Sequence, residues 1–316
     1  MKNLIFKNGD AMPLLGLGTW KSRPKEIYTA VRSALELGYR HIDCAAIYGN
    51  EKEIGQALDD AFRAGDIARE DLWITSKLWN NSHRKGAVEN ALKQTLAELR
   101  LDCLDLYLVH WPVAFRPEVV YPSKGADFLS LEEVPLLETW DGMAECAAAG
   151  LARHIGVSNF SVKKLDTLIQ HDMPPEVNQI ELHPYLQQPE MLDFCRKHYI
   201  HLTAYAPLGS PDRPSALKRQ GEPSLLDNEI IADIAGRNNC TPAQVLIAWA
   251  LQRGTAVIPK SVNPEGLGEN LAAAEIWLDK EEMAAVSTLE KGYRFVSGEF
   301  WTMEGSPYSL ETLWDE

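Results

Sequence analysis

The chain has 316 residues, of which 45% are hydrophobic and 24% are charged, a composition typical of a folded globular protein rather than a disordered one. It carries 31 Lys and Arg residues against 45 Asp and Glu residues, so its formal net charge is −14. So acidic a chain is poorly suited to bind a nucleic-acid backbone, and we expect no nucleic-acid partner. No run of about 18 apolar residues occurs, so we expect no membrane span.

The five cysteines are odd in number and widely spaced, and their spacing fits neither a zinc site nor a disulfide framework. The first residues lack the apolar run and the small-residue cleavage site of a signal peptide. We therefore expect a cytoplasmic protein whose thiols are all free.

Short apolar segments alternate with longer amphipathic segments along most of the chain. The expected strands are residues 14–18, 40–43, 72–77, 105–110, 154–157, 176–180, 201–205 and 256–259. The expected helices include residues 25–37, 51–64, 84–99, 135–149, 162–171, 190–198 and 242–253. This alternation predicts an α/β fold with a parallel sheet covered by helices. Eight such units in this length favour a (β/α)8 TIM barrel, and we expect it to form a single domain over residues 1–316.

Two further features complete the predicted barrel. Residues 4–14, with Asn8-Gly9 in the middle, predict an N-terminal β-hairpin that closes the bottom of the barrel. Three stretches, 111–133, 207–227 and 292–316, are too long for ordinary connections. Long loops at the carboxyl face of a barrel are where binding sites are built.

Polar side chains stand at or just beyond the ends of seven successive expected strands. They are Asp43, Lys77, His110, Ser158 with Asn159, Gln179, Tyr205 and Lys260, and Tyr48 follows Asp43 by five residues. In a TIM barrel these ends meet at one rim. The set has one carboxylate and no metal-ligand spacing, which disfavours paired-carboxylate glycoside hydrolysis and metal-dependent hydrolysis. We also exclude a Rossmann domain, because Gly16-Leu17-Gly18 lacks the third glycine of the dinucleotide fingerprint.

Asp43, Tyr48 and Lys77 together suggest acid catalysis by a phenol. An unperturbed tyrosine has a pKa of about 10, so at neutral pH it is protonated but donates its proton reluctantly. A neighbouring ammonium stabilises the phenolate and lowers that pKa, and a carboxylate keeps the ammonium charged and in place. With His110 orienting a carbonyl oxygen, this set can protonate an oxygen while a hydride arrives, or perform the reverse.

At these positions the sequence resembles the aldo-keto reductase superfamily, in particular its aldehyde/aldose reductase branch. The similar segments, in order along nearly the whole chain, are residues 16–20, 38–51, 72–79, 104–112, 155–160, 177–185, 204–214 and 258–262. The resemblance implies an NAD(P)H-dependent carbonyl reductase that works without a metal. It also implies that Asp43, Tyr48, Lys77 and His110 are the catalytic residues, with Tyr48 as the proton donor.

The resemblance further implies a cofactor site with three parts. Ser158, Asn159 and Gln179 would hold the nicotinamide carboxamide, and Tyr205 would stack on the ring. Lys21, Asp212 and Lys260 would clasp the pyrophosphate, while Glu269 and Asn270 would contact the adenine. The complete cofactor set is Thr19, Trp20, Lys21, Asp43, Ser158, Asn159, Gln179, Tyr205, Leu208, Ser210, Asp212, Lys260, Ser261, Val262, Asn263, Glu269 and Asn270.

Two positions depart from the family pattern. Gly266 stands where NADPH-preferring relatives carry an arginine that pairs with the 2′-phosphate, so a planar, bidentate partner is missing. We expect NADPH to remain favoured and NADH to be usable too. Ser215 stands where relatives often have a tryptophan, which suggests a wider or wetter pocket.

Aromatic and apolar side chains near the strand ends predict a pocket wall. The expected substrate-binding residues are Trp20, Ile47, Trp79, His110, Trp111 and Phe115. Such a wall beside a few polar groups suits small carbonyl compounds. Trp301, Met303 and Tyr308 belong to the C-terminal tail, which in relatives closes the pocket. The sequence leaves open whether the tail does so here or packs on the flank of the barrel.

Glu181 and His183 lie beyond a strand end, where we expect them to fix the loop that follows Gln179 rather than to catalyse. We expect Cys44 to be barrel packing, because no base partner for a nucleophile is apparent.

Three functions remain to be weighed. The first is reduction of small-molecule aldehydes, including aldoses, and some ketones, by a protein that we expect to be monomeric. The second is a non-catalytic nicotinamide-binding regulatory subunit, which the retained catalytic set disfavours. The third is an isomerase or lyase with Lys77 as a Schiff-base nucleophile, which leaves Ser158, Asn159 and Gln179 unexplained.

Overall fold

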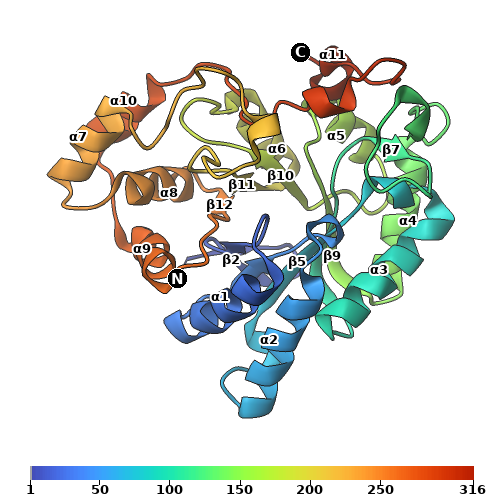
Figure 1. Ribbon diagram of the computed structural model, residues 1–316, viewed down its shortest axis with the longest axis horizontal. Helices are drawn as coiled ribbons and strands as arrows, with labels where there is room; N and C mark the ends of the chain where they lie inside the picture. Colours follow the sequence, from blue (N-terminus) through green and yellow to red (C-terminus); the bar gives the residue numbers. More distant parts are fainter. Residues whose placement is uncertain (1) are drawn as a thin grey trace.

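The computed structural model describes residues 2–316, and in this part of the chain strands alternate with helices that lie outside them (Figure 1). The helices are α1 (Pro24–Leu37), α2 (Glu51–Ala64), α3 (Lys85–Leu99), α4 (Leu136–Ala148), α5 (Val162–Leu168), α6 (Pro189–His198), α7 (Glu229–Arg237), α8 (Pro242–Gln252), α9 (Pro264–Ala272), α10 (Lys280–Ser287) and α11 (Leu310–Trp314). The strands are β1 (Asn3–Ile5), β2 (Ala11–Pro13), β3 (Leu17–Gly18), β4 (His41–Asp43), β5 (Trp73–Leu78), β6 (Leu104–Val109), β7 (Ala114–Phe115), β8 (Phe128–Leu129), β9 (Ala152–Ser158), β10 (Val177–Glu181), β11 (His201–Tyr205) and β12 (Ala256–Val257).

The central sheet of residues 2–316 has eight strands in the order β3-β4-β5-β6-β9-β10-β11-β12, and each neighbouring pair is parallel. Its two edges meet. Leu15 pairs in parallel with Val257, whose N–H donates to Leu14 O at 2.7 Å. At this seam a Cβ on Gly18 would lie 2.6 Å from the carbonyl oxygen of Ile258, so only glycine allows the close approach. The sheet is a closed barrel, which confirms the predicted (β/α)8 fold.

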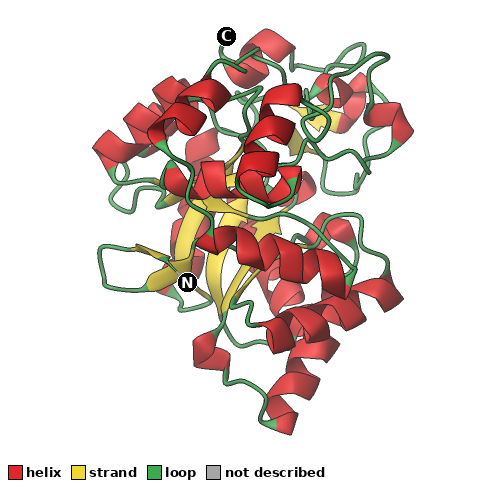
Figure 2. Cartoon of the chain, turned by 90° about the vertical axis from the view of Figure 1, so that its left-hand side faces the viewer, coloured by secondary structure: helices red, strands yellow, loops and turns green. Residues whose placement is uncertain are grey.

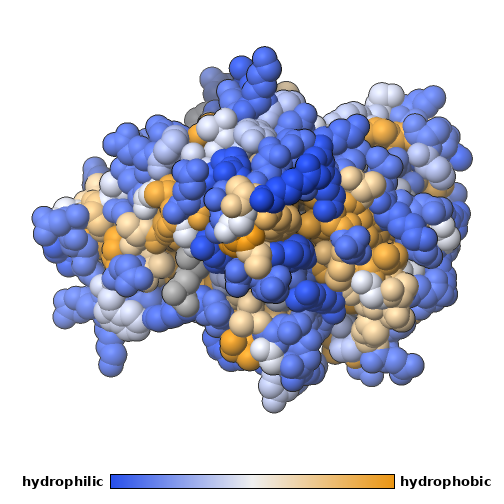
Figure 3. All heavy atoms as spheres, turned by 90° about the horizontal axis from the view of Figure 1, so that it is seen from below, coloured by the Kyte–Doolittle hydropathy of each residue, from blue (hydrophilic) through white to orange (hydrophobic). Residues whose placement is uncertain are grey.

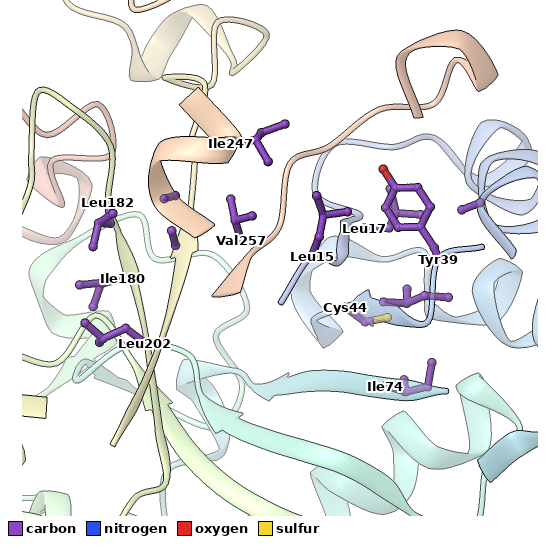
Figure 4. Packing of buried hydrophobic residues seen from close by; sticks show 14 of the residues in the cluster. Leu15, Leu17, Tyr39, Cys44, Ile74, Ile180, Leu182, Leu202, Ile247 and Val257 are labelled. Carbon is purple, nitrogen blue, oxygen red and sulfur yellow. The ribbon is translucent and has the colours of Figure 1, made fainter. Parts of the chain in front are cut away.

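The main apolar core is made of buried side chains from the strands and from the surrounding helices. Figure 2 shows these strands in yellow and the helices around them in red. In Figure 4, Leu15 and Leu17 lie beside the ring of Tyr39, whose hydroxyl donates to Leu267 O at 2.9 Å and so ties α9 to the barrel. Cys44 is fully buried in this cluster, as expected. Full burial of each such apolar side chain contributes about 1.5–3 kcal/mol.

The bottom of the barrel is closed by the predicted hairpin. β1 and β2 pair antiparallel, with Asn3 opposite Pro13, and Gly9 takes a positive φ of 94° in the turn. Phe6 and Met12 are buried against Trp73 and other residues inside the barrel. A hairpin sealing one end leaves the opposite end, at the carboxyl termini of the strands, for a site.

Some elements differ from the expected ones. The strands expected at 14–18 and 256–259 shorten to β3 and β12, because the backbone at the seam bonds outside regular ladder positions. The long stretch 111–133 contains the small antiparallel pair β7–β8. Helices α7, α9, α10 and α11 are not among the expected ones, and each has only five to nine residues.

No helix within residues 2–316 is long and apolar enough to cross a membrane. On the face seen in Figure 3, the apolar areas are broken up by hydrophilic side chains.

Candidate active site

A cavity of about 670 Å³ opens at the carboxyl ends of the barrel strands. Most of the residues that the sequence proposes for a site line it: Thr19, Trp20, Lys21, Asp43, Ile47, Tyr48, Trp79, His110, Trp111, Ser158, Asn159, Gln179, Tyr205, Leu208, Ser210, Asp212, Lys260, Ser261, Val262 and Asn263. These residues are spread over some 245 positions of the chain, and closure of the barrel brings them to one rim.

A buried ion pair lies under the floor of this cavity. Lys77, near the end of β5, donates from Nζ to Asp43 Oδ1 at 2.5 Å and to the carbonyl oxygen of Cys44 at 2.8 Å. Both side chains of the pair are almost fully buried. The other oxygen of Asp43 accepts a hydrogen bond of 2.7 Å from Gln179 Nε2. Although burial opposes the charged form, the Asp43 carboxylate raises the pKa of Lys77 above its ordinary value.

Tyr48 stands beside this pair, in the 3-10 turn Ala46–Tyr48 that follows β4. Its ring centre is 5.2 Å from Lys77 Nζ, and its ring meets that of His110 edge-on at 5.8 Å. Burial raises the pKa of Tyr48 to about 12, against the lowering effect of the Lys77 charge. The ammonium of Lys77 does lower this pKa, as expected from the sequence, but desolvation has the larger effect and the net shift is upward. The phenol is therefore fully protonated at neutral pH.

His110 follows β6 and is neutral, because burial and the nearby charge of Lys77 hold its pKa well below its usual range. Within residues 2–316 its Nδ1 is buried and has no hydrogen-bond partner. Its carbonyl oxygen accepts from Asn159 Nδ2 at 2.9 Å, which fixes the backbone of the residue. A neutral imidazole offers one N–H donor and no charge to an oxygen in the cavity.

Asn159 links several of the groups that line the cavity. Its left-handed backbone (φ 65°) turns the chain at the end of β9, and its Oδ1 accepts from the hydroxyl of Tyr205 at 2.7 Å. The neighbouring Ser158 Oγ donates to the carbonyl oxygen of Gln179 at 2.8 Å. Tyr205 is thereby held by its hydroxyl while its half-buried ring lines the cavity, so a flat surface is fixed beside amide and hydroxyl groups.

Charged side chains meet at the other end of the cavity. Lys21 Nζ donates to Asp212 Oδ1 at 2.5 Å and to Ser210 Oγ at 2.8 Å, and Lys260 Nζ lies 3.2 Å from Asp212 Oδ2. Two ammonium groups share one carboxylate here, which leaves one excess positive charge. A fixed aromatic face with amide groups at one end and excess positive charge at the other fit the nicotinamide ring and the pyrophosphate of a dinucleotide.

The substrate end of the cavity is mostly aromatic, and here the structure corrects one residue. Phe115 does not line the cavity: it is buried behind the wall, where its ring contacts those of Trp79 and Trp301 edge-on or tilted at 5.9 and 5.3 Å. Trp301 itself lines the cavity, whereas Met303 and Tyr308 pack in the aromatic cluster behind it. The C-terminal tail therefore both closes part of the cavity and packs against the protein behind it, the two roles that the sequence left open.

Two proposed adenine contacts lie away from the cavity lining. Glu269 is exposed and Asn270 is buried, and both belong to α9, which begins just after Asn263. Ser215 is also outside the lining, whereas Leu217, in the same short turn, is part of it.

Sequence reasoning missed several cavity residues: Tyr121, Pro122, Leu217, Val296 and Phe300. All of them belong to the three long stretches singled out from the sequence, but no periodicity marks which loop residues turn inward. Residues 2–316 contain no cluster of His, Cys, Asp and Glu that could hold a metal ion, and their five cysteines form no disulfide.

Comparison with known proteins agrees with this geometry. Residues 14–291 match the model of the aldo/keto reductase family. A protein named aldo/keto reductase from Synechocystis sp. is 55% identical over 317 residues, which cover 100% of this chain and 97% of that protein. Aldo-keto reductase family 1 member A1-A of Danio rerio is 43% identical over 93% of this chain and 91% of its own length. Member A1 of the same family in Gallus gallus is 44% identical over 95% of this chain and 92% of its own length.

Residues 14–291 contain all eight strands of the barrel, and the relatives cover more than nine-tenths of the chain. The chain belongs to the aldo/keto reductase family and is an oxidoreductase that uses a nicotinamide cofactor.

Proposed function

We propose that this protein reduces aldehydes, including aldoses, and some ketones to alcohols, with NADPH favoured and NADH also used. The observation that carries the proposal is the buried Lys77–Asp43 pair beside a protonated Tyr48, at the floor of a cavity with an aromatic wall. A small carbonyl compound fits such a cavity, which combines an aromatic wall with a few polar groups. We propose that the enzyme acts as a monomer.

When bound, the nicotinamide supplies the hydride that reaches the carbonyl carbon. Tyr205, Ser158, Asn159 and Gln179 would hold its ring, and Lys21 and Lys260, bridged by Asp212, would hold the pyrophosphate. Thr19, Trp20, Leu208, Ser210, Ser261, Val262 and Asn263 would line the rest of the cofactor path. Holding both reactants in one geometry can remove several kcal/mol from the barrier.

Tyr48 gives its proton to the carbonyl oxygen, and the phenolate that forms is stabilised by Lys77. Asp43 keeps Lys77 charged and fixes its position through the 2.5 Å contact. Because burial raises the pKa of Tyr48 to about 12, the phenol holds its proton until the developing oxyanion draws it away. The neutral His110 donates a hydrogen bond that orients the carbonyl oxygen toward Tyr48.

The proposal is tested by steady-state kinetics with a panel of aromatic, aliphatic and sugar aldehydes against both cofactors. We expect turnover with several aldehydes and a larger kcat/KM with NADPH than with NADH. Tight cofactor binding without turnover of any carbonyl compound would instead support the non-catalytic regulatory subunit.

A further inference from the structure

The carboxylate of Glu181, at the end of β10, is buried and has no part in the proposed chemistry. Its Oε1 accepts from the backbone N–H of Phe295 at 2.6 Å, and its Oε2 accepts from that of Val296 at 2.8 Å. The ring of His183 contacts Oε1 through Nε2 at 2.8 Å. Both oxygens of this buried carboxylate thus accept hydrogen bonds from a segment that begins 114 residues further along the chain.

The contact between Glu181 and His183 lies in the loop after Gln179, where the sequence predicts a structural role for both residues. The carboxylate of Glu181 in addition accepts two hydrogen bonds from the C-terminal tail. A buried carboxylate without hydrogen-bond donors is strongly unfavourable, so these two N–H groups stabilise the buried position of Glu181.

The anchored segment leads directly to the substrate end of the cavity. Val296 lines the cavity itself, and four to five residues later Phe300 and Trp301 line it too. Phe300 and Trp301 both contact Trp111 edge-on, at 5.7 Å between ring centres. The position of this wall therefore depends on where residues 295 and 296 are held.

The hydrogen bonds from Phe295 and Val296 to Glu181 are called the anchor below, and the ring of Phe295 attaches the same segment a second time. Its ring is 5.0 Å from that of His183, and Arg213 lies over it at 5.1 Å. Arg213 is itself buried and donates to the carbonyl oxygens of Gly209 and Ser210 at 3.2 Å. Phe295 thus lies between the barrel and the loop that follows β11, and it contacts both.

We infer that Glu181 is a positioning residue that sets substrate specificity: it holds the tail so that Val296, Phe300 and Trp301 form the wall against which an aromatic or similarly bulky aldehyde packs. The inference rests on the proposed reductase function for its kinetic consequence, but the anchor itself is a property of the chain alone. Small aliphatic aldehydes, which are too short to use this wall, do not depend on it.

The test is Glu181→Gln, which keeps the size of the side chain but replaces one acceptor by a donor. We expect KM for benzaldehyde to rise roughly tenfold to a hundredfold, as expected for a misplacement of about 1 Å. KM for propanal and kcat for both aldehydes should change little. The matched control is Glu282→Gln, since Glu282 is also buried and accepts from a backbone N–H, that of Asp279 at 3.0 Å, but lies outside the cavity lining.

Hydrogen exchange supplies a readout that needs no activity. In the wild-type chain the amides of Phe295 and Val296 should exchange much more slowly than those of Ser297 and Gly298, which have no acceptor in the described chain. In Glu181→Gln the slow exchange should be lost at one or both of these amides, because only one acceptor remains, whereas Glu282→Gln should retain it at both. The wild-type measurement tests whether the hydrogen bonds from residues 295 and 296 to Glu181 form, even if the variant does not fold.

Fast exchange of residues 295 and 296 in the wild type would overturn the inference, as would an unchanged ratio of the benzaldehyde and propanal KM values in a folded Glu181→Gln protein. Equal loss of activity toward both aldehydes would show a merely structural role. If the wild type reduces neither aldehyde, the proposed function fails, while slow exchange at 295 and 296 would still establish the anchor.

Discussion

Lys77 and Asp43 form an ion pair of 2.5 Å in which both side chains are almost fully buried. If either partner were removed, the other would be left as a buried charge without a counter-ion, which is strongly unfavourable, so the two groups stay paired. Burial also raises the pKa of the nearby Tyr48 to about 12, so its phenol holds its proton at neutral pH. Burial at this site thus holds the ammonium of Lys77 against Asp43 and favours the protonated form of Tyr48, which is the form that the proposed reaction needs.

Lys77→Met should be costly for stability as well as for activity. The variant leaves the Asp43 carboxylate buried beside Gln179 without its cation, and removal of one partner of a buried pair costs about 3–5 kcal/mol. Urea denaturation should show this fall in the free energy of unfolding, and carbonyl reduction should be lost. The double variant Asp43→Asn with Lys77→Met should recover most of the stability and none of the activity. A double variant as unstable as the single one would show that the lysine stem, rather than its charge, is what the fold requires.

Tyr48→Phe should reduce kcat for carbonyl reduction by roughly 10²–10⁴-fold, the usual contribution of a positioned general acid. Since the substitution removes only a hydroxyl and leaves Ser158, Asn159 and Gln179 in place, the dissociation constant of NADPH should stay nearly unchanged. Stopped-flow turnover and fluorescence titration measure the two quantities separately. Unchanged turnover in this variant would remove Tyr48 from its proposed role.

The architecture and most of the rim could be predicted from the sequence because they follow from local patterns. Alternation of apolar strands with amphipathic helices predicts a barrel, and the rule that barrel sites lie at the carboxyl ends of strands selects Asp43, Lys77, His110 and Gln179. These residues are indeed brought together. The short seam strands β3 and β12 were the least well bounded, because their pairing depends on closure rather than on their own composition.

The inner surface of the loops could not be predicted in the same way. Tyr121, Leu217 and Phe300 line the cavity although no repeat in the sequence distinguishes them from exposed loop residues. Phe115 was assigned to the wall from its position after a strand, but the tail places Trp301 in front of it. The tail position depends on contacts such as Glu181 with Phe295, which join residues 114 positions apart and leave no local signal.

Glu51 should make the stability of the protein depend on pH. It is buried at the start of α2, where it accepts from Ser76 at 2.5 Å and Thr95 at 3.1 Å, and burial raises its pKa to about 7. The folded-state pKa lies above the ordinary value of 4.5, so the folded protein binds this proton more tightly than the unfolded chain. The stabilisation is fully present below pH 4.5 and is lost as the pH rises through 7, by about 3 kcal/mol.

Glu51→Gln removes this titration, so its free energy of unfolding should vary less between pH 5 and 8 than that of the wild type. At pH 8 the variant should be at least as stable as the wild type. Urea denaturation at several pH values measures both quantities. Glu53→Gln, on the same helix, is the matched control and should retain the wild-type slope. Parallel pH profiles for Glu51→Gln and the wild type would mean that Glu51 is charged in the folded protein at neutral pH.

Gly266→Arg should shift cofactor preference toward NADPH. Gly266 lies in the first turn of α9, next to Ser261 and Asn263 at the lysine end of the cavity. A guanidinium there can pair with two oxygens of the 2′-phosphate, which Lys260 as a single point charge cannot do. The added Cβ would lie 2.8 Å from Ser261 Oγ, so this hydroxyl, which bonds to the backbone of Asn263, must shift. Affinity for NADPH should therefore rise by about 1.5–3 kcal/mol relative to that for NADH, measured by titration with each cofactor. The control is Gly266→Ala, which carries the same Cβ without the charge and should leave the ratio of the two dissociation constants unchanged. Equal shifts in affinity for both cofactors in Gly266→Arg would disprove a 2′-phosphate contact at this position.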